Sequence, residues 1–102
     1  MKDLLINGTR FLTTDEIADA TLDYASMLTQ FHLVDTIRFP AVVEGTASQT
    51  AVAVGVGAHI VVIDAPDVIP IRLRGADEAA EIIRSQRANR ADPWAGRGVA
   101  AG

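Results

Sequence analysis

The stretch from Gln49 to Pro66, QTAVAVGVGAHIVVIDAP, constrains the fold more than any other part of the chain, because it is strongly apolar and carries no charge before Asp64. Side chains alternate between the two faces of a strand, so its residues divide into two sets. The even-numbered set is large and mostly β-branched: Val52, Val54, Val56, Ile60 and Val62. The odd-numbered set begins with small residues: Ala51, Ala53, Gly55 and Gly57. We therefore expect the even-numbered set in a hydrophobic core and a flat surface on the other face.

Two β-hairpins are predicted. An unbroken strand through the whole central stretch would exceed the usual length of about 3–10 residues, so Gly55–Ala58 should fold it into a hairpin. Near the N-terminus, Asn7-Gly8 separates two short apolar runs, Leu4–Ile6 and Phe11–Leu12. Asn-Gly tolerates positive φ at both central positions of a tight turn, which predicts a second, N-terminal hairpin.

Two amphipathic helices are also predicted. Thr13-Thr14-Asp15-Glu16 matches a capping box, in which Thr13 accepts from the Glu16 amide and the Glu16 carboxylate accepts from the Thr13 amide. Residues of the inner face then recur at helical spacing: Ile17, Thr21, Tyr24, Ala25, Leu28 and Phe31. A second helix follows Gly75, with a narrower stripe formed by Ala79, Ile82, Ile83 and Gln86.

Two further strands complete the predicted elements, at 34–43 and 69–73, with a turn over Glu44–Ser48 between the first of them and the central stretch. Proline cannot donate to a ladder, so Pro40 and Pro70 should each lie at a sheet edge or bulge. These elements predict an α+β two-layer sandwich, in which a largely antiparallel sheet carries both helices on one face. We expect a single domain over residues 1–88 and a Gly/Ala-rich C-terminal tail over 89–102.

Composition limits the classes of function. A chain of 102 residues that is 49% hydrophobic fits one globular domain. The absence of cysteine excludes disulfides, thiolate metal sites and a cysteine nucleophile. A formal net charge of −4 argues against nucleic acid as a partner. No apolar run approaches the ~18–20 residues of a membrane span and no secretory leader is recognised, so we expect a cytoplasmic protein that does not bind membranes.

The set of residues closest to a metal site is His32, His59, Asp64 and Asp67. Imidazole and carboxylate groups suit zinc or iron when three or four of them converge. His59 and Asp64 are an odd number of residues apart, however, so on one straight strand they would point to opposite faces. The chain also carries no phosphate-binding loop and no hydrolase motif. We therefore expect no metal and no cofactor.

The flat face of the central stretch is the feature that we connect to function. Two helices can cover one side of the sheet, so the other side needs a cover, and self-association is the simplest one. Trp is enriched among interface anchors, which adds the tail residue to the hypothesised interface. That interface comprises Ala51, Ala53, Gly55 and Trp94. We predict a non-enzymatic interaction domain that forms a homodimer or meets another protein; the alternatives are a structural subunit of a larger assembly, and a small-molecule binder or metal-dependent enzyme using His59 with Asp64 or Asp67.

Overall fold

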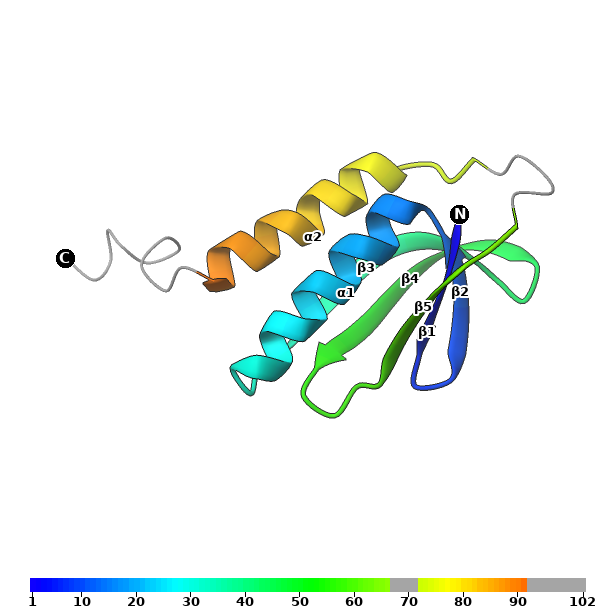
Figure 1. Ribbon diagram of the computed structural model, residues 1–102. Coiled ribbons are helices and arrows are strands. Elements are labelled where there is room, and N and C mark those ends of the chain that lie inside the picture. Colours follow the sequence, from blue (N-terminus) through cyan, green and yellow to red (C-terminus); the bar gives the residue numbers. More distant parts are fainter. Residues whose placement is uncertain (67–71, 92–102) are drawn as a thin grey trace.

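The computed structural model describes residues 1–66 and 72–91 (Figure 1). The elements are β1 (Lys2–Ile6), β2 (Thr9–Thr13), α1 (Asp15–Gln30), β3 (Val34–Val43), β4 (Thr46–Gly55), β5 (Ile60–Asp64) and α2 (Ala76–Ala91). The five strands form one antiparallel sheet in the order β4-β3-β2-β1-β5, with both helices on one side of it. The predicted α+β architecture is confirmed. Most of the strand predicted at 69–73, and Trp94, lie outside the described residues, and α2 continues to Ala91, past the expected start of the tail.

The N-terminal hairpin forms where Asn7-Gly8 predicts it. Ile6 pairs with Thr9 across the turn, and the φ angles of Asn7 and Gly8 are 51° and 87°. Positive φ at both positions gives the turn the right-handed twist of the strands that it joins. The local sequence therefore determines both the existence and the register of this hairpin.

The first helix begins one residue later than the capping-box pattern predicts. Thr14 is the N-cap, and its hydroxyl accepts a hydrogen bond of 3.2 Å from the Ile17 amide. Thr13 is instead the last residue of β2, where it is fully buried and donates to the Pro40 carbonyl at 2.9 Å. The capping box centred on Thr13 is wrong, because Thr13 faces the interior of the sheet and its hydroxyl is used there.

The hairpin of β3 and β4 is the longest pairing in the sheet. Every residue of β3 is paired with β4 around a two-residue turn, Glu44-Gly45, with φ angles of 50° and 79°. The predicted turn over Glu44–Ser48 is therefore too long. The Pro40 carbonyl accepts from Thr13, so the polar backbone groups of Pro40 point away from β4. The missing N–H of this proline consequently costs the β3–β4 ladder nothing.

The central stretch breaks where predicted but does not form a hairpin. β4 ends at Gly55 and β5 begins at Ile60, yet β5 pairs with β1 at the opposite end of the strand order. Gly55 has a φ of 122°, and a Cβ atom there would overlap the carbonyl oxygen of Leu33. Glycine is thus required at the point where the chain leaves the ladder. The hairpin prediction is wrong because β5 completes the core beside β1 instead of returning along β4.

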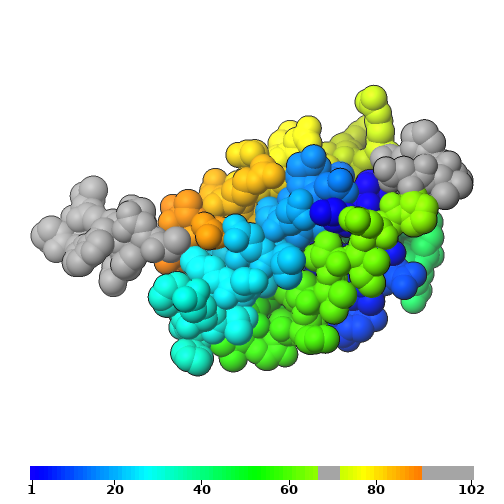
Figure 2. Space-filling view, in the orientation of Figure 1, coloured from blue at the N-terminus to red at the C-terminus, as the bar shows by residue number. Residues whose placement is uncertain are grey.

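The hydrophobic core lies between the sheet and the helices, and Figure 2 shows α1 packed between α2 and the strands β4 and β5. Its largest fully buried side chains come from both layers: Leu4, Ile17, Tyr24, Leu28, Ile37, Phe39, Val54 and Ile83. The even-numbered face of the central stretch contributes as predicted, since Val54 is buried and Val52, Ile60 and Val62 pack against the core. Val56 lies in the turn that follows β4 and is exposed, and on α2 Ile82 is exposed while Ala80 is buried.

Candidate interaction surface

An apolar patch lies on the outer face of the sheet, opposite the helices. The alternation of β5 turns Ile60 and Val62 inward, so Val61 and Ile63 point outward, with 38% and 49% of their surface exposed. The same alternation in β1, β2 and β3 turns three half-buried apolar side chains outward. The apolar patch consists of Leu5, Leu12, Val42, Val61 and Ile63.

The strand register brings the residues of the apolar patch close together on neighbouring strands. Val61 lies opposite Leu5 on β1, and Leu12 of β2 lies opposite Val42 of β3. Two charged residues of opposite sign, Asp3 and Arg10, lie within the patch on β1 and β2 and also line a shallow hollow beside Leu12 and Val42. Sequence reasoning missed this patch. The alternation was visible in each strand, but only the strand order places these residues next to one another.

Three of the residues predicted for the interface, Ala51, Ala53 and Gly55, lie on β4 and differ in exposure. Ala51 and Ala53 are exposed on the outer face of β4, opposite Arg38 and Thr36 of β3. Gly55 is buried. It lacks a side chain because the Leu33 carbonyl of the same chain approaches it closely, so a partner is not needed to explain the glycine. Trp94 lies outside the described residues. Ala51 and Ala53 therefore extend the outer face beyond the apolar patch, toward the β4 edge of the sheet.

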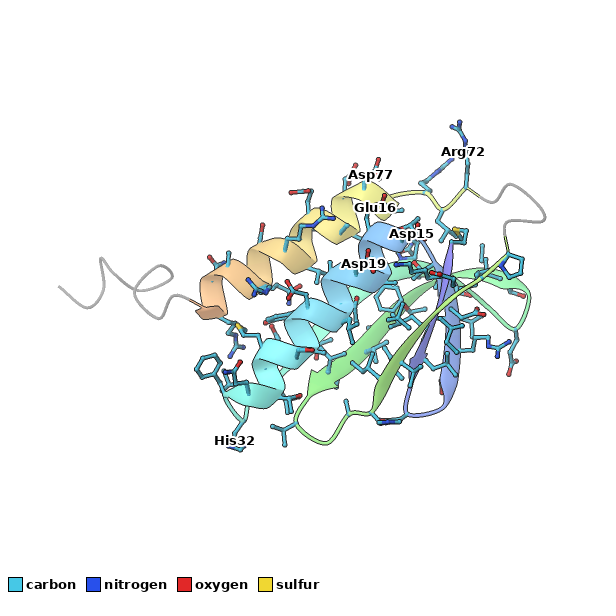
Figure 3. The ribbon with its side chains drawn as sticks, viewed as in Figure 1. Asp15, Glu16, Asp19, His32, Arg72 and Asp77 are labelled. Atoms are coloured by element: carbon cyan, nitrogen blue, oxygen red, sulfur yellow. The ribbon has the colours of Figure 1, made fainter. Side chains whose placement is uncertain are left out.

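His32, one of the predicted metal candidates, belongs to the C-terminal cap of α1. Leu33 donates to the Leu28 carbonyl at 2.8 Å and His32 donates to the Thr29 carbonyl at 3.2 Å, which are the two hydrogen bonds of a Schellman motif. His32 has a φ of 57°, the left-handed conformation that this motif requires. Figure 3 shows its side chain at the end of the helix, pointing away from the body of the protein.

The other metal candidates do not converge. The His59 backbone is held by Asn7, since the His59 amide donates to Asn7 Oδ1 at 2.7 Å and its carbonyl accepts from the Asn7 amide at 2.8 Å. Asp64 is at the far end of β5, about 16 Å along the strand from His59 at ~3.3 Å per residue. Asp67 lies outside the described residues. Among residues 1–66 and 72–91, no three His, Asp or Glu side chains are grouped as metal ligands would be.

Acidic side chains gather at the N-terminal ends of the two helices: Asp15, Glu16 and Asp19 on α1 and Asp77 on α2 (Figure 3). Carboxylates at these positions stabilise the positive end of the helix dipole. Asp19 also accepts from Lys2 Nζ at 2.9 Å, and this hydrogen bond raises the pKa of Lys2. The cluster is explained by helix stability and needs no ligand.

A polar cluster joins α1, β3 and α2 on the other side of the core. The hydroxyl of the buried Tyr24 donates to Asp35 Oδ2, which also accepts from Gln86 Nε2 at 3.1 Å. Asp35 Oδ1 accepts from the Thr36 amide at 2.8 Å, and Arg90 lies 3.8 Å from the same oxygen. Burial acts to raise the pKa of Asp35, but these donors and the Arg90 charge outweigh it and hold the pKa below its usual value.

The same cluster raises the pKa of Tyr24, first because the phenol is buried and second because ionisation would place its charge against the Asp35 carboxylate. Gln86 donates a further hydrogen bond of 3.0 Å to the Thr36 carbonyl. All of these contacts tie α2 to α1 and to β3. The polar cluster therefore holds α2 against α1 and β3, and its acidic groups, Asp35 and Tyr24, are engaged in hydrogen bonds.

In the described part of the chain no helix has the length and apolarity needed to cross a membrane. Comparison of the chain with protein-family models, with curated proteins and with solved structures finds no match.

Proposed function

We propose that this protein is a non-enzymatic interaction domain that self-associates through the outer face of its sheet. The apolar patch is the observation that supports the proposal, because none of the described helices or strands covers Val61 and Ile63. Contiguous exposed apolar side chains on a small domain mark a contact surface. The residues that could carry chemistry are either dispersed, as His32, His59 and Asp64 are, or engaged in the polar cluster.

A second copy fits this surface because its charges are self-complementary. Asp3 and Arg10 carry opposite charges within one patch, so a two-fold axis through the patch can place the Arg10 of each copy against the Asp3 of the other. The apolar residues between them then become buried on both sides. A stable contact needs about 1,000 Å² of total buried surface, which one sheet face of a domain this size can provide.

The test is the mass of the protein in solution. Sedimentation equilibrium of the parent should show self-association at tens of micromolar. Ile63→Lys should raise the dissociation constant of the face contact at least about tenfold, because it buries a charge in the apolar patch. Ile82→Lys is the matched control, since Ile82 is 59% exposed on α2, on the helical side of the molecule. A parent that remains monomeric, or an Ile63→Lys variant that associates like the parent, refutes the proposal.

A further inference from the structure

The outer edge of β4 is a second surface, distinct from the outer face. β4 is the terminal strand of the sheet and is ten residues long, and its only strand partner within the described part of the chain is β3. An edge strand presents a row of backbone N–H and C=O groups that are available to another strand. Its length makes this edge twice as long as that of β5, the five-residue strand at the other end.

The hydrogen bonds of β3 identify which groups of β4 face the edge. The carbonyl of Thr36 accepts from Gln86 and the carbonyl of Pro40 accepts from Thr13. The backbone N–H and C=O groups of even-numbered residues of β3 therefore point away from β4, and those of odd-numbered residues point toward it. Ladder bonds alternate along an antiparallel pair, so the β4 residues opposite the even-numbered ones direct their N–H and C=O groups to the free edge. Four of these residues, Ala47, Gln49, Ala51 and Ala53, are exposed; the fifth, Gly55, is buried at the end of the strand.

This edge lacks the charged residues, prolines and β-bulges by which natural proteins prevent edge strands from pairing with other chains. Thr46–Gly55 contains no charged residue, no proline and no interruption of its pairing with β3. The open side of β3, in contrast, carries Pro40 and is occupied by the Gln86 side chain. The unprotected edge is therefore the side of β4 that faces away from β3.

We propose that β4 pairs antiparallel with β4 of a second copy, around a two-fold axis at Thr50, so that the two sheets become one; this extends the proposed self-association to a second contact. In this register Ala47 lies opposite Ala53 and Gln49 lies opposite Ala51. Each of these pairs exchanges two hydrogen bonds, so that the N–H and C=O groups of Ala47, Gln49, Ala51 and Ala53 are satisfied in both strands.

The register also explains why the partner is another copy of the same strand. Three of the four outer-face side chains that meet are alanine, and the fourth, Gln49, lies opposite Ala51, so the side chains do not obstruct the pairing. No like charges oppose each other, because the strand has no charged residue. On the inner face, Thr50 meets Thr50 of the second copy, a pair that is favourable across antiparallel strands. The apolar patch remains uncovered on the joined sheet, so edge and face contacts are independent and together give a tetramer.

Hydrogen exchange of the full chain tests the edge directly. The amides of Ala47, Gln49, Ala51 and Ala53 should gain at least about tenfold protection between micromolar and near-millimolar protein, because only strand pairing gives them acceptors. A face-to-face contact would leave these four amides unprotected. Fast exchange of these amides at every protein concentration overturns the edge pairing. Protection that is independent of concentration overturns it too, because another segment of the same chain would then cover the edge.

Variants separate the edge from the face. Ala51→Pro removes an edge-facing donor that β3 does not use, and edge strands tolerate proline there, so the variant should fold and lose the edge contact. Ala51→Thr keeps the donor and should retain the contact; Ala47→Pro repeats the test if Ala51→Pro fails to fold. With both contacts present, Ala51→Pro and Ile63→Lys each reduce a tetramer to a dimer. If only Ala51→Pro lowers the mass, the face proposal alone fails; if only Ile63→Lys lowers it, the edge proposal alone fails.

Discussion

Replacing Tyr24 by Phe removes one hydroxyl from the polar cluster and leaves the packing of the ring intact. Tyr24 is fully buried on α1, and its hydroxyl donates to Asp35 Oδ2. A hydrogen bond to a charged group contributes about 1.5–3 kcal/mol to stability. Asp35 is 23% exposed and keeps its bonds from Gln86 and the Thr36 amide, so the lower end of that range applies.

The expected loss for Tyr24→Phe is therefore about 1.5 kcal/mol, equivalent to a fall of about 6–12 °C in melting temperature for a domain of this size. Urea and thermal unfolding followed by circular dichroism measure it. Thr21→Val is the matched control, because Thr21 is also fully buried on α1 and its hydroxyl has no hydrogen-bond partner among the described residues. Removing an unsatisfied hydroxyl should leave stability unchanged or raise it.

The pH dependence of the difference in free energy of unfolding between the parent and Tyr24→Phe provides a second test. The pKa of Asp35 is lowered in the folded state, so its contribution is present above the unfolded value of about 4 and is lost as the pH falls through the folded value. The difference in free energy of unfolding between the parent and Tyr24→Phe should therefore become smaller at acid pH. The pKa of Tyr24 is raised, so its contribution is present below the unfolded value of about 10 and is lost as the pH rises.

Tyr24 is the only tyrosine in the chain, so ultraviolet absorbance titration of the parent observes this phenol alone. Its ionisation should be delayed well beyond pH 10 and should coincide with alkaline unfolding. Two results would refute the reasoning: a Tyr24→Phe variant that melts with the parent at neutral pH, or a tyrosine that titrates normally in the folded protein.

Three further substitutions test the backbone of the fold by urea unfolding. Thr14→Ala should cost about 1 kcal/mol through loss of the α1 N-cap, and an unchanged midpoint would place the start of the helix elsewhere. Gly55→Ala should cost more than about 2 kcal/mol, because its Cβ would overlap the Leu33 carbonyl at a φ of 122°; a variant as stable as the parent contradicts that geometry. His32→Gly should gain up to about 1 kcal/mol by relieving a left-handed φ, and a clear loss of stability would mean that the His32 side chain makes a contact of its own.

The amino-acid sequence determined those features that depend on residues close together in the chain. Asn7-Gly8 specifies its hairpin because its turn favours positive φ at both positions, and 34–43 reads as a strand with the bounds that β3 has. The periodicity of residues 17–28 identifies the buried side of α1, and the alternation of Val52 and Val54 identifies the inner face of β4. Each of these signals spans a few positions, so no knowledge of distant neighbours is needed to interpret it.

The tertiary structure decided which strands and which residues are neighbours in the fold. The capping-box pattern favours Thr13 as the cap, and only the pairing of Thr13 with Lys2 of β1 and its hydrogen bond to Pro40 of β3 assign it to the sheet. Residues 60–64 alternate equally well beside β4 or beside β1, and the choice of β1 is what assembles the apolar patch and leaves the edge of β4 free. Strand pairing joins residues far apart in sequence through generic backbone groups, so the local pattern fixes which face of a strand is buried but not which strand lies next to it.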